Sequence, residues 1–140
     1  MDILFDTNIV LDALLDRKPW SLYAKTLWEA NLDGTLAAYI TATSLTDIFY
    51  ISRRITDRAK AWQIIEICLD QLHVISVDIY ELQLAKTLSG NDFEDNLQIA
   101  CAMSAKLDAI VTRDPSGFSA GAVPVFTSQQ MCLKVFGPTE

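Results

Sequence analysis

Short apolar runs alternate along the chain with longer segments in which apolar residues recur at helical spacing. The first run, residues 2–5, stops at Asp6-Thr7-Asn8, and apolar residues then return three and four positions apart. This order predicts a strand, a polar turn and a helix. Further apolar or β-branched runs predict strands at residues 35–40, 74–77, 109–112 and 123–127.

Helical patterns fill the segments between the predicted strands. The longest, from about Thr56 to Leu72, places Trp62, Ile65, Leu69 and Leu72 on one apolar face. The other predicted helices are the one after Asp6-Thr7-Asn8, the one from Pro19 to the Asp33-Gly34 turn, residues 44–53, 78–88 and 92–106, and one beginning at Ser128.

Alternation of short strands with helices indicates the fold class. Parallel neighbouring strands need crossover connections, and helices supply them on both faces of the sheet. We therefore expect an α/β fold with three layers, α/β/α, around a central, mainly parallel sheet of four to five strands. A length of 140 residues predicts one domain over residues 1–140.

Carboxylates stand where predicted strands end or helices begin. Asp6 follows the first strand, Asp47 lies early in the helix at 44–53, Asp92 and Asp95 open the helix at 92–106, and Asp114 follows the strand at 109–112. Such positions meet at the carboxyl edge of a parallel sheet. Converging carboxylates repel one another, and a divalent cation removes that repulsion; oxygen ligands without His or Cys favour Mg²⁺ or Mn²⁺.

Such a cation would polarise a phosphoryl oxygen and activate water, so the acids predict metal-dependent phosphodiester hydrolysis. Each acid also has a purely structural interpretation. Ser44 with Asp47, and Asp92 with Asp95, have the spacing of a helix capping box, and Asp114 before Pro115 is typical of a turn. The joint pattern favours chemistry over four independent caps.

Four ordered segments also resemble the motifs of PIN-domain nucleases, above all the small VapC-like toxins of bacterial toxin–antitoxin pairs. These segments are Phe5-Asp6-Thr7-Asn8, the helix start at 44–47, Asp92-Phe93-Glu94-Asp95 with residues 97–102, and residues 110–114 with Phe118. The resemblance spans essentially the whole chain and implies a PIN-like α/β/α fold.

The resemblance implies roles for individual residues. Asp6, Asp95 and Asp114 match the family's metal-binding aspartates, and Asp47 stands where the family more often has Glu. Asp is one methylene shorter, so direct and water-mediated coordination by Asp47 both stay open. Asp92 is a further candidate ligand of second rank. Candidate supporting residues, which would orient carboxylates or water, are Thr7, Asn8 and Thr112.

Basic residues are few but clustered. The net charge is −7, which disfavours passive coating of DNA or of anionic membranes. A basic segment follows the helix that carries Asp47, and Arg113 precedes Asp114, so both could contact RNA phosphates; a solvated loop explains the basic segment equally well. The candidate RNA contacts are Arg53, Arg54, Arg58, Lys60 and Arg113.

The remaining features concern location and competing chemistry. Cys68, Cys101 and Cys132 lie among apolar neighbours and predict buried, reduced thiols. Neither a secretory signal nor a membrane span is expected, which favours the cytoplasm. His73 has no partner motif, which disfavours a histidine base. An aspartyl-phosphate enzyme is disfavoured because the D-x-D pair and the late Lys-Pro are missing.

The leading hypothesis is an Mg²⁺- or Mn²⁺-dependent endoribonuclease that acts on RNA, with one or two ions, and forms the toxin of a type II pair. The resemblance implies a cognate antitoxin and a homodimer as partners. Two alternatives stay open: a catalytically weak binding module that acts through a protein partner, and a solitary RNA-processing nuclease.

Overall fold

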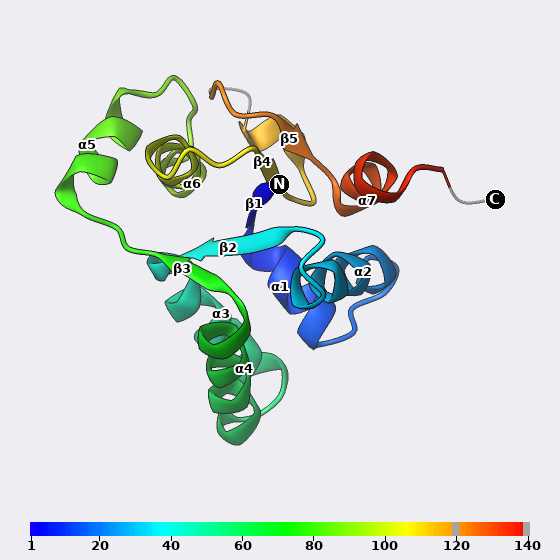
Figure 1. Ribbon diagram of the computed structural model, residues 1–140. Helices are drawn as coiled ribbons and strands as arrows, with labels where there is room; N and C mark the ends of the chain where they lie inside the picture. The colour runs from blue at the N-terminus through cyan, green and yellow to red at the C-terminus, as the bar shows by residue number, and fades with distance from the viewer. Residues whose placement is uncertain (119–120, 139–140) are drawn as a thin grey trace.

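A five-stranded parallel sheet lies at the centre of the computed structural model, which describes residues 1–118 and 121–138 (Figure 1). The strand order is β3-β2-β1-β4-β5, and all four pairings are parallel. This confirms the predicted α/β class. The strands are β1 (Asp2–Phe5), β2 (Ala37–Thr41), β3 (His73–Ile75), β4 (Ala109–Val111) and β5 (Val125–Phe126).

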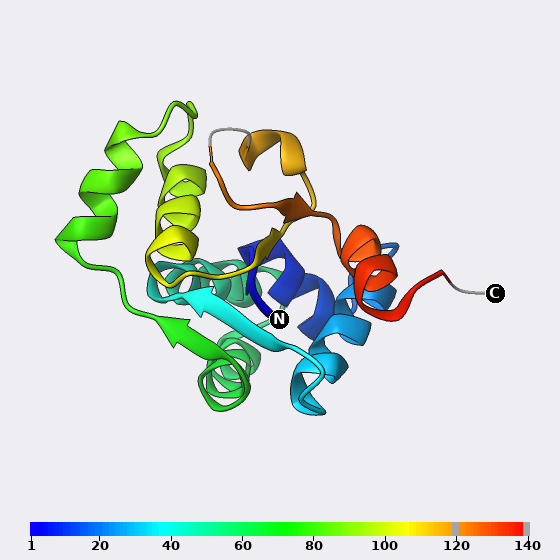
Figure 2. The same cartoon turned by 45° about the horizontal axis from the view of Figure 1, so that its top comes forward.

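Helices cover both faces of the sheet, as Figures 1 and 2 show from two directions. Helices α1 to α4 and α7 pack on one face, and α5, α6 and a short 3-10 helix, η1, lie on the other. The helices are α1 (Thr7–Leu14), α2 (Ser21–Leu32), α3 (Ala42–Ile55), α4 (Arg58–Gln71), α5 (Ile79–Thr87), α6 (Phe93–Ser104), η1 (Pro115–Phe118) and α7 (Ser128–Phe136).

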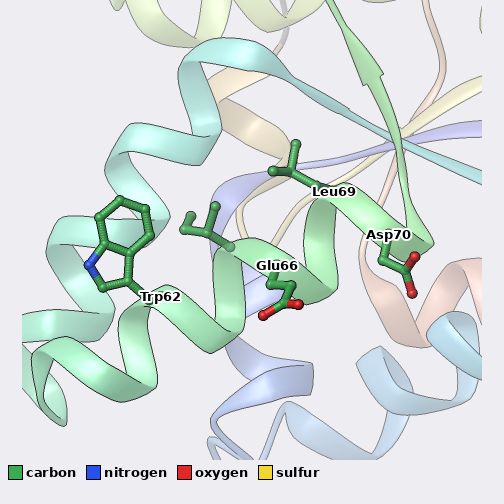
Figure 3. Close-up of a pocket in the computed structure, with 5 residues that line it drawn as sticks. Trp62, Glu66, Leu69 and Asp70 are labelled. Carbon is green, nitrogen blue, oxygen red and sulfur yellow. The ribbon is translucent and has the colours of Figure 1, made fainter.

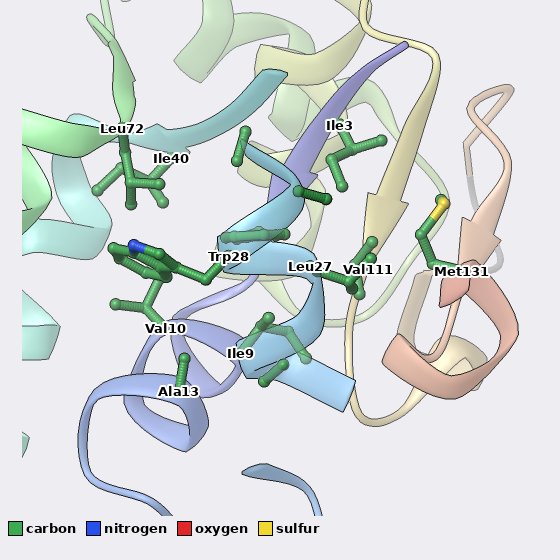
Figure 4. Close-up of a cluster of buried hydrophobic side chains, with 14 of the residues drawn as sticks. Ile3, Ile9, Val10, Ala13, Leu27, Trp28, Ile40, Leu72, Val111 and Met131 are labelled. Atoms are coloured by element: carbon green, nitrogen blue, oxygen red, sulfur yellow. The ribbon is translucent and has the colours of Figure 1, made fainter. Parts of the chain in front are cut away.

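Alternation along the central strands builds two cores. Ile3 and Phe5 of β1 join the larger core, where Trp28 of α2 packs, and Leu4 points to the opposite face with Ile110 and Phe118. Successive strand side chains point to opposite faces, so both faces of β1 are apolar because both are covered. Figure 4 shows the larger core between α1, α2 and the sheet.

Parallel strands bring three chain segments to one edge of the sheet. β1 ends at Phe5, next to Val111 at the end of β4, and Asp6 N donates to Val111 O at 3.0 Å. β2 ends at Thr41, where α3 begins. This carboxyl edge is where the predicted site residues were expected to meet.

Several predicted boundaries shift by a few residues. The strand expected from residue 35 begins at Ala37, because Thr35 is held in a turn by hydrogen bonds to Asp33. Helix α3 begins at Ala42 rather than Ser44, because Thr41 at the end of β2 serves as its N-cap. The capping box predicted for Ser44 and Asp47 is therefore wrong.

The apolar face predicted for the helix at 56–72 is confirmed only in part: Leu72 is buried and Ile65 packs against the larger core, but the other two residues are exposed. In α4 the buried side chains are Ala61, Ile64 and Cys68, whereas Trp62 is 60% exposed and Leu69 is 59% exposed. Packing against α3 selects the neighbouring face, and the Trp62 ring contacts Phe49 at 4.9 Å between centroids.

The thiols of Cys68, Cys101 and Cys132 are free and buried, as the sequence predicted. Across the described residues, the helices are too short or too polar to span a lipid bilayer.

Candidate metal centre

Asp6 is the most tightly held carboxylate at the carboxyl edge. It is the N-cap of α1, and its Oδ1 accepts from Thr7 N at 2.8 Å and from Gln98 Nε2 at 2.6 Å. Its Oδ2 accepts from Thr112 Oγ1 at 2.8 Å. Because both oxygens accept hydrogen bonds, the Asp6 carboxylate has one defined orientation at the carboxyl edge of the sheet.

An open cavity of about 400 Å³ lies beside Asp6. Its walls come from the starts of α1 and α6 and from the middle of α3, which are far apart in the sequence. The lining residues are Asp6, Thr7, Asn8, Asp47, Tyr50, Ile51, Arg54, Asp92, Glu94 and Asp95. The structure thus gathers most of the predicted site residues around one space.

Asp47 and Glu94 meet across this cavity. Asp47 lies on α3 and Glu94 on the first turn of α6, and their carboxyl groups form a hydrogen bond. The pKa of Glu94 is raised to about 7, chiefly by burial, then by the hydrogen bond and negative charge of Asp47, with smaller effects from Asp6 and Asp92. Glu94 is therefore partly protonated near neutral pH when no cation is bound.

Asp95 is the third residue of α6. Burial raises its pKa to about 6, helped by the negative charges of Asp92, Asp6 and Asp114. Asp92 is the N-cap of α6, because its Oδ1 accepts from Asp95 N at 2.9 Å. The structural interpretation of Asp92 as a helix cap is confirmed.

Asp114 lies beside the cavity rather than in its wall. Its Oδ1 accepts from Ser116 N at 3.2 Å and from Ser116 Oγ at 2.5 Å, so it caps the turn that leads into η1. Its charge still acts on Asp95. Gly117 lies against the Asp95 carboxylate. A Cβ atom at position 117 would stand 2.8 Å from Asp95 Oδ2.

The predicted basic contacts separate into different environments. Arg54 lines the cavity, two helical turns after Asp47, whereas Arg53 and Arg58 are exposed outside it and Lys60 is partly exposed at the start of α4. Arg113, predicted to contact phosphate, binds protein instead. Its guanidinium donates to the fully buried Asp12 and stacks on Trp20 at 3.7 Å.

Two functional candidates escaped the sequence analysis. Glu94 and Gln98 both face the acidic cavity or its carboxylates. Gln98 follows Glu94 by four residues and Asp95 by three, which are the spacings of neighbours on one helix face. That periodicity was the available signal. The exposed His73 stacks on Tyr39 at 4.7 Å and is outside the cavity lining.

The residues around the cavity fit a hard divalent cation. The donors are carboxylate and hydroxyl oxygens, which suit Mg²⁺ or Mn²⁺. Thr7 Oγ1 is buried and has no hydrogen-bond partner in the described part of the chain. Within residues 1–118 and 121–138 no three acidic, His or Cys side chains already form an ion cage. Ion binding therefore requires carboxylates around the cavity to rotate inward.

Comparison with solved structures establishes likeness of fold. A chain of the Rickettsia felis VapBC2 complex, bound to promoter DNA, has TM-score 0.68 and 16% identity, covering 89% of this chain and 97% of that one. Mycobacterium tuberculosis VapC20, a Sarcin-Ricin loop cleaving toxin, has TM-score 0.69 and 16% identity over 85% and 95%. A Klebsiella pneumoniae toxin–antitoxin complex has TM-score 0.66 and 20% identity over 90% and 97%.

Sequence comparison gives the family. No curated protein matches this chain significantly. A family model described as PIN domain matches residues 2–116, which is most of the chain and includes all the acidic segments described above. The resemblance of the sequence motifs is thereby confirmed, and the chain belongs to the PIN domain family.

Proposed function

We propose that this protein is a divalent-metal-dependent endoribonuclease, the toxin of a type II toxin–antitoxin pair. The observation that carries the proposal is the cavity at the carboxyl edge, where acids from α3 and from the start of α6 surround the Asp6 carboxylate, which three hydrogen bonds already orient. Burial, together with repulsion from the neighbouring acids, raises the pKa values of Asp95 and Glu94, and both effects favour a bound cation over uncompensated carboxylates.

The metal ligands in this proposal are Asp6, Asp47, Asp95 and Asp114, with Asp92 as an additional candidate. A bound Mg²⁺ or Mn²⁺ supplies charge to polarise the phosphoryl group and activate a water molecule. Hydrolysis would form a bond from the water oxygen to phosphorus and break the bond from phosphorus to the leaving ribose oxygen, which would take up the proton that the water loses.

The protein's own part is orientation and charge. Thr112 and Gln98 fix the Asp6 carboxylate, so it need not reorganise when the substrate arrives. Arg54 lies in the cavity wall, where its positive charge can bind a substrate phosphate. Tyr50 lines the same cavity and is 60% exposed, so its ring is accessible to an RNA base.

Substrate and partner are supported by the structural relatives. VapC20 is a Sarcin-Ricin loop cleaving toxin, and the Klebsiella protein belongs to a toxin–antitoxin complex. By analogy we infer an RNA substrate, a cognate antitoxin, a homodimer and a cytoplasmic location for this protein. Light scattering coupled to size-exclusion chromatography tests the dimer, and an adjacent antitoxin reading frame tests the pairing.

A cleavage assay tests the enzymatic proposal directly. Purified protein is incubated with assorted RNAs in Mg²⁺, Mn²⁺ or EDTA, beside the Asp6→Asn and Asp95→Asn variants. We expect cleavage only with a divalent cation, and a loss of about 100-fold or more in each variant, because each removes a ligand charge. Cleavage that survives EDTA, or survives both substitutions, contradicts the metal-nuclease proposal.

One observation favours the alternative of a protein-binding module. A surface cavity of about 470 Å³ on α4 is lined by Trp62, Ile65, Glu66, Leu69 and Asp70, and Figure 3 shows Trp62 and Leu69 along the outer side of this helix. Large exposed apolar side chains in one patch are typical of interaction surfaces. Partner binding at α4 and hydrolysis at the acidic cavity are compatible, and the cleavage assay decides whether catalysis accompanies binding.

A further inference from the structure

We propose that Glu94 is an additional metal ligand that shares one side of the acidic cavity with Asp47. The inference rests on the metal-dependent activity proposed above and concerns a residue outside the four predicted ligands. It assigns a chemical role to the second carboxylate of the first turn of α6.

The contacts of Glu94 carry the proposal. Its side chain lines the same cavity as Asp6 and Asp47, and its carboxyl group forms a hydrogen bond with that of Asp47. Two carboxyl groups in contact repel each other once both are ionised, and a divalent cation between them removes that repulsion. The other acid at the start of the helix, Asp92, already uses Oδ1 to cap Asp95 N.

A buried hydroxyl gives a second and independent indication of a ligand. Thr7 is only 7% exposed and lines this cavity, and its Oγ1 has no hydrogen-bond partner among the described residues. Unpaired buried hydroxyl groups are uncommon, and a bound ion or its water shell satisfies them. Thr7 lies on α1, so the indication does not depend on the acids of α6.

The lengths of the Asp47 and Glu94 side chains explain why both residues would be needed as ligands on one side of the cavity. Asp47 extends only one methylene from α3, and Glu94 extends two from α6, so together they bridge the two helices. If this bridge binds the ion, a longer side chain at position 47 should replace Glu94. The double variant Asp47→Glu with Glu94→Gln is therefore expected to regain the affinity that Glu94→Gln alone loses.

Calorimetric titration of RNA-free protein with Mn²⁺ tests the proposal without measuring activity. We expect Glu94→Gln to weaken Mn²⁺ binding about tenfold or more, because one ligand charge is lost. Glu66→Gln is the matched control, since Glu66 is an exposed helical glutamate on α4. Thermal unfolding without metal confirms that each variant folds, and Glu94→Ala, which also removes the charge, replaces any Glu94→Gln protein that does not.

The outcomes separate this inference from the proposed function. Wild-type Mn²⁺ affinity in Glu94→Gln, with loss in Asp95→Asn, overturns the role of Glu94 and leaves the metal site standing. Absence of Mn²⁺ binding, or wild-type binding in both Asp6→Asn and Asp95→Asn, overturns the metal site itself. A double variant as weak as Glu94→Gln alone overturns the pairing with Asp47.

Discussion

Asp6 shows how one side chain can be a helix cap and a candidate metal ligand at once. An N-cap needs only one carboxylate oxygen for a backbone amide. Here the same oxygen also accepts from Gln98, and the other oxygen accepts from Thr112. The cap therefore contributes to the orientation of the carboxylate, and the structural and functional interpretations of Asp6 describe the same geometry.

Adding one methyl group at Gly117 tests whether the position of the Asp95 carboxylate matters for cleavage. Gly117→Ala would place a Cβ atom 2.8 Å from Asp95 Oδ2, which forces that carboxylate to move. Displacement of a ligand by about 1 Å lowers catalysis on the order of 100-fold. We expect RNA cleavage to fall by about 10–100-fold, with a melting temperature within about 2 °C of the wild type, because the clash is with a side-chain end.

Gly34→Ala is the contrasting control for this measurement. Gly34 has φ +84° and an open space where the Cβ would lie, far in sequence from the acids. Alanine there strains the backbone and should cost about 1 kcal/mol of stability without altering cleavage. Unchanged cleavage by Gly117→Ala would show that the Asp95 carboxylate position does not limit the reaction.

At the scale of elements, the buried Asp12 joins α1 to the segment after β4. Its side chain is fully buried and accepts from Arg17 Nε at 3.0 Å and from Arg113 Nε at 2.9 Å. Arg113 stands between Thr112, which binds Asp6, and Asp114. The ion pair therefore fixes the segment that supplies two site residues, which gives Arg113 a structural role.

The Asp12→Asn variant measures the strength of this connection. It keeps the side-chain shape but leaves two guanidinium groups without their buried counter-charge. Loss of one partner of a buried pair costs about 3–5 kcal/mol, so we expect a large drop in the urea midpoint at pH 7. Asp16→Asn removes the exposed pair with Lys25 and should change the midpoint little. Equal midpoints in the two variants would contradict the structural role of Asp12.

Elements were more predictable than their faces and ends. Each of the five predicted strands exists. The central strands β1 and β4 are apolar because helices bury both of their faces, whereas the outer strands β3 and β5 are only partly covered. The start of α3 was missed because Thr41 is both the last strand residue and the N-cap. The buried face of α4 depends on packing against α3, so Trp62 could not be assigned from periodicity alone.

At the scale of the molecule, the sequence predicted where the acids would converge, but not which further side chains would join them. Strand ends converge by topology, so Asp6, Asp95 and Asp114 could be expected at one edge. Glu94 and Gln98 join them through the rotation of α6 about its axis, which is set by tertiary packing. Asp12 resembles any polar helical residue until the fold buries it.

The concentration of acids also makes the stability of the whole protein depend on pH. In the folded state the pKa of Asp95 is raised from 3.8 to about 6 and that of Glu94 from 4.5 to about 7, chiefly by burial. The unfolded chain releases these protons at lower pH than the folded chain. Their contribution to stability is therefore complete below about pH 4 and is lost as pH rises to about 7.

We expect the melting temperature of the metal-free protein to fall as pH rises from 4 to 7. Saturating Mn²⁺ should raise the melting temperature again near pH 7, because a bound cation stabilises the ionised carboxylates. The lowered pKa values of Asp16 and Asp33 act below about pH 4, and the raised thiol pKa values act above pH 9, so neither set obscures this window. Differential scanning calorimetry with EDTA or Mn²⁺ measures both effects. The Asp95→Asn variant should show a shallower pH dependence than the wild type, and an unchanged slope would mean that folding does not raise the pKa of Asp95.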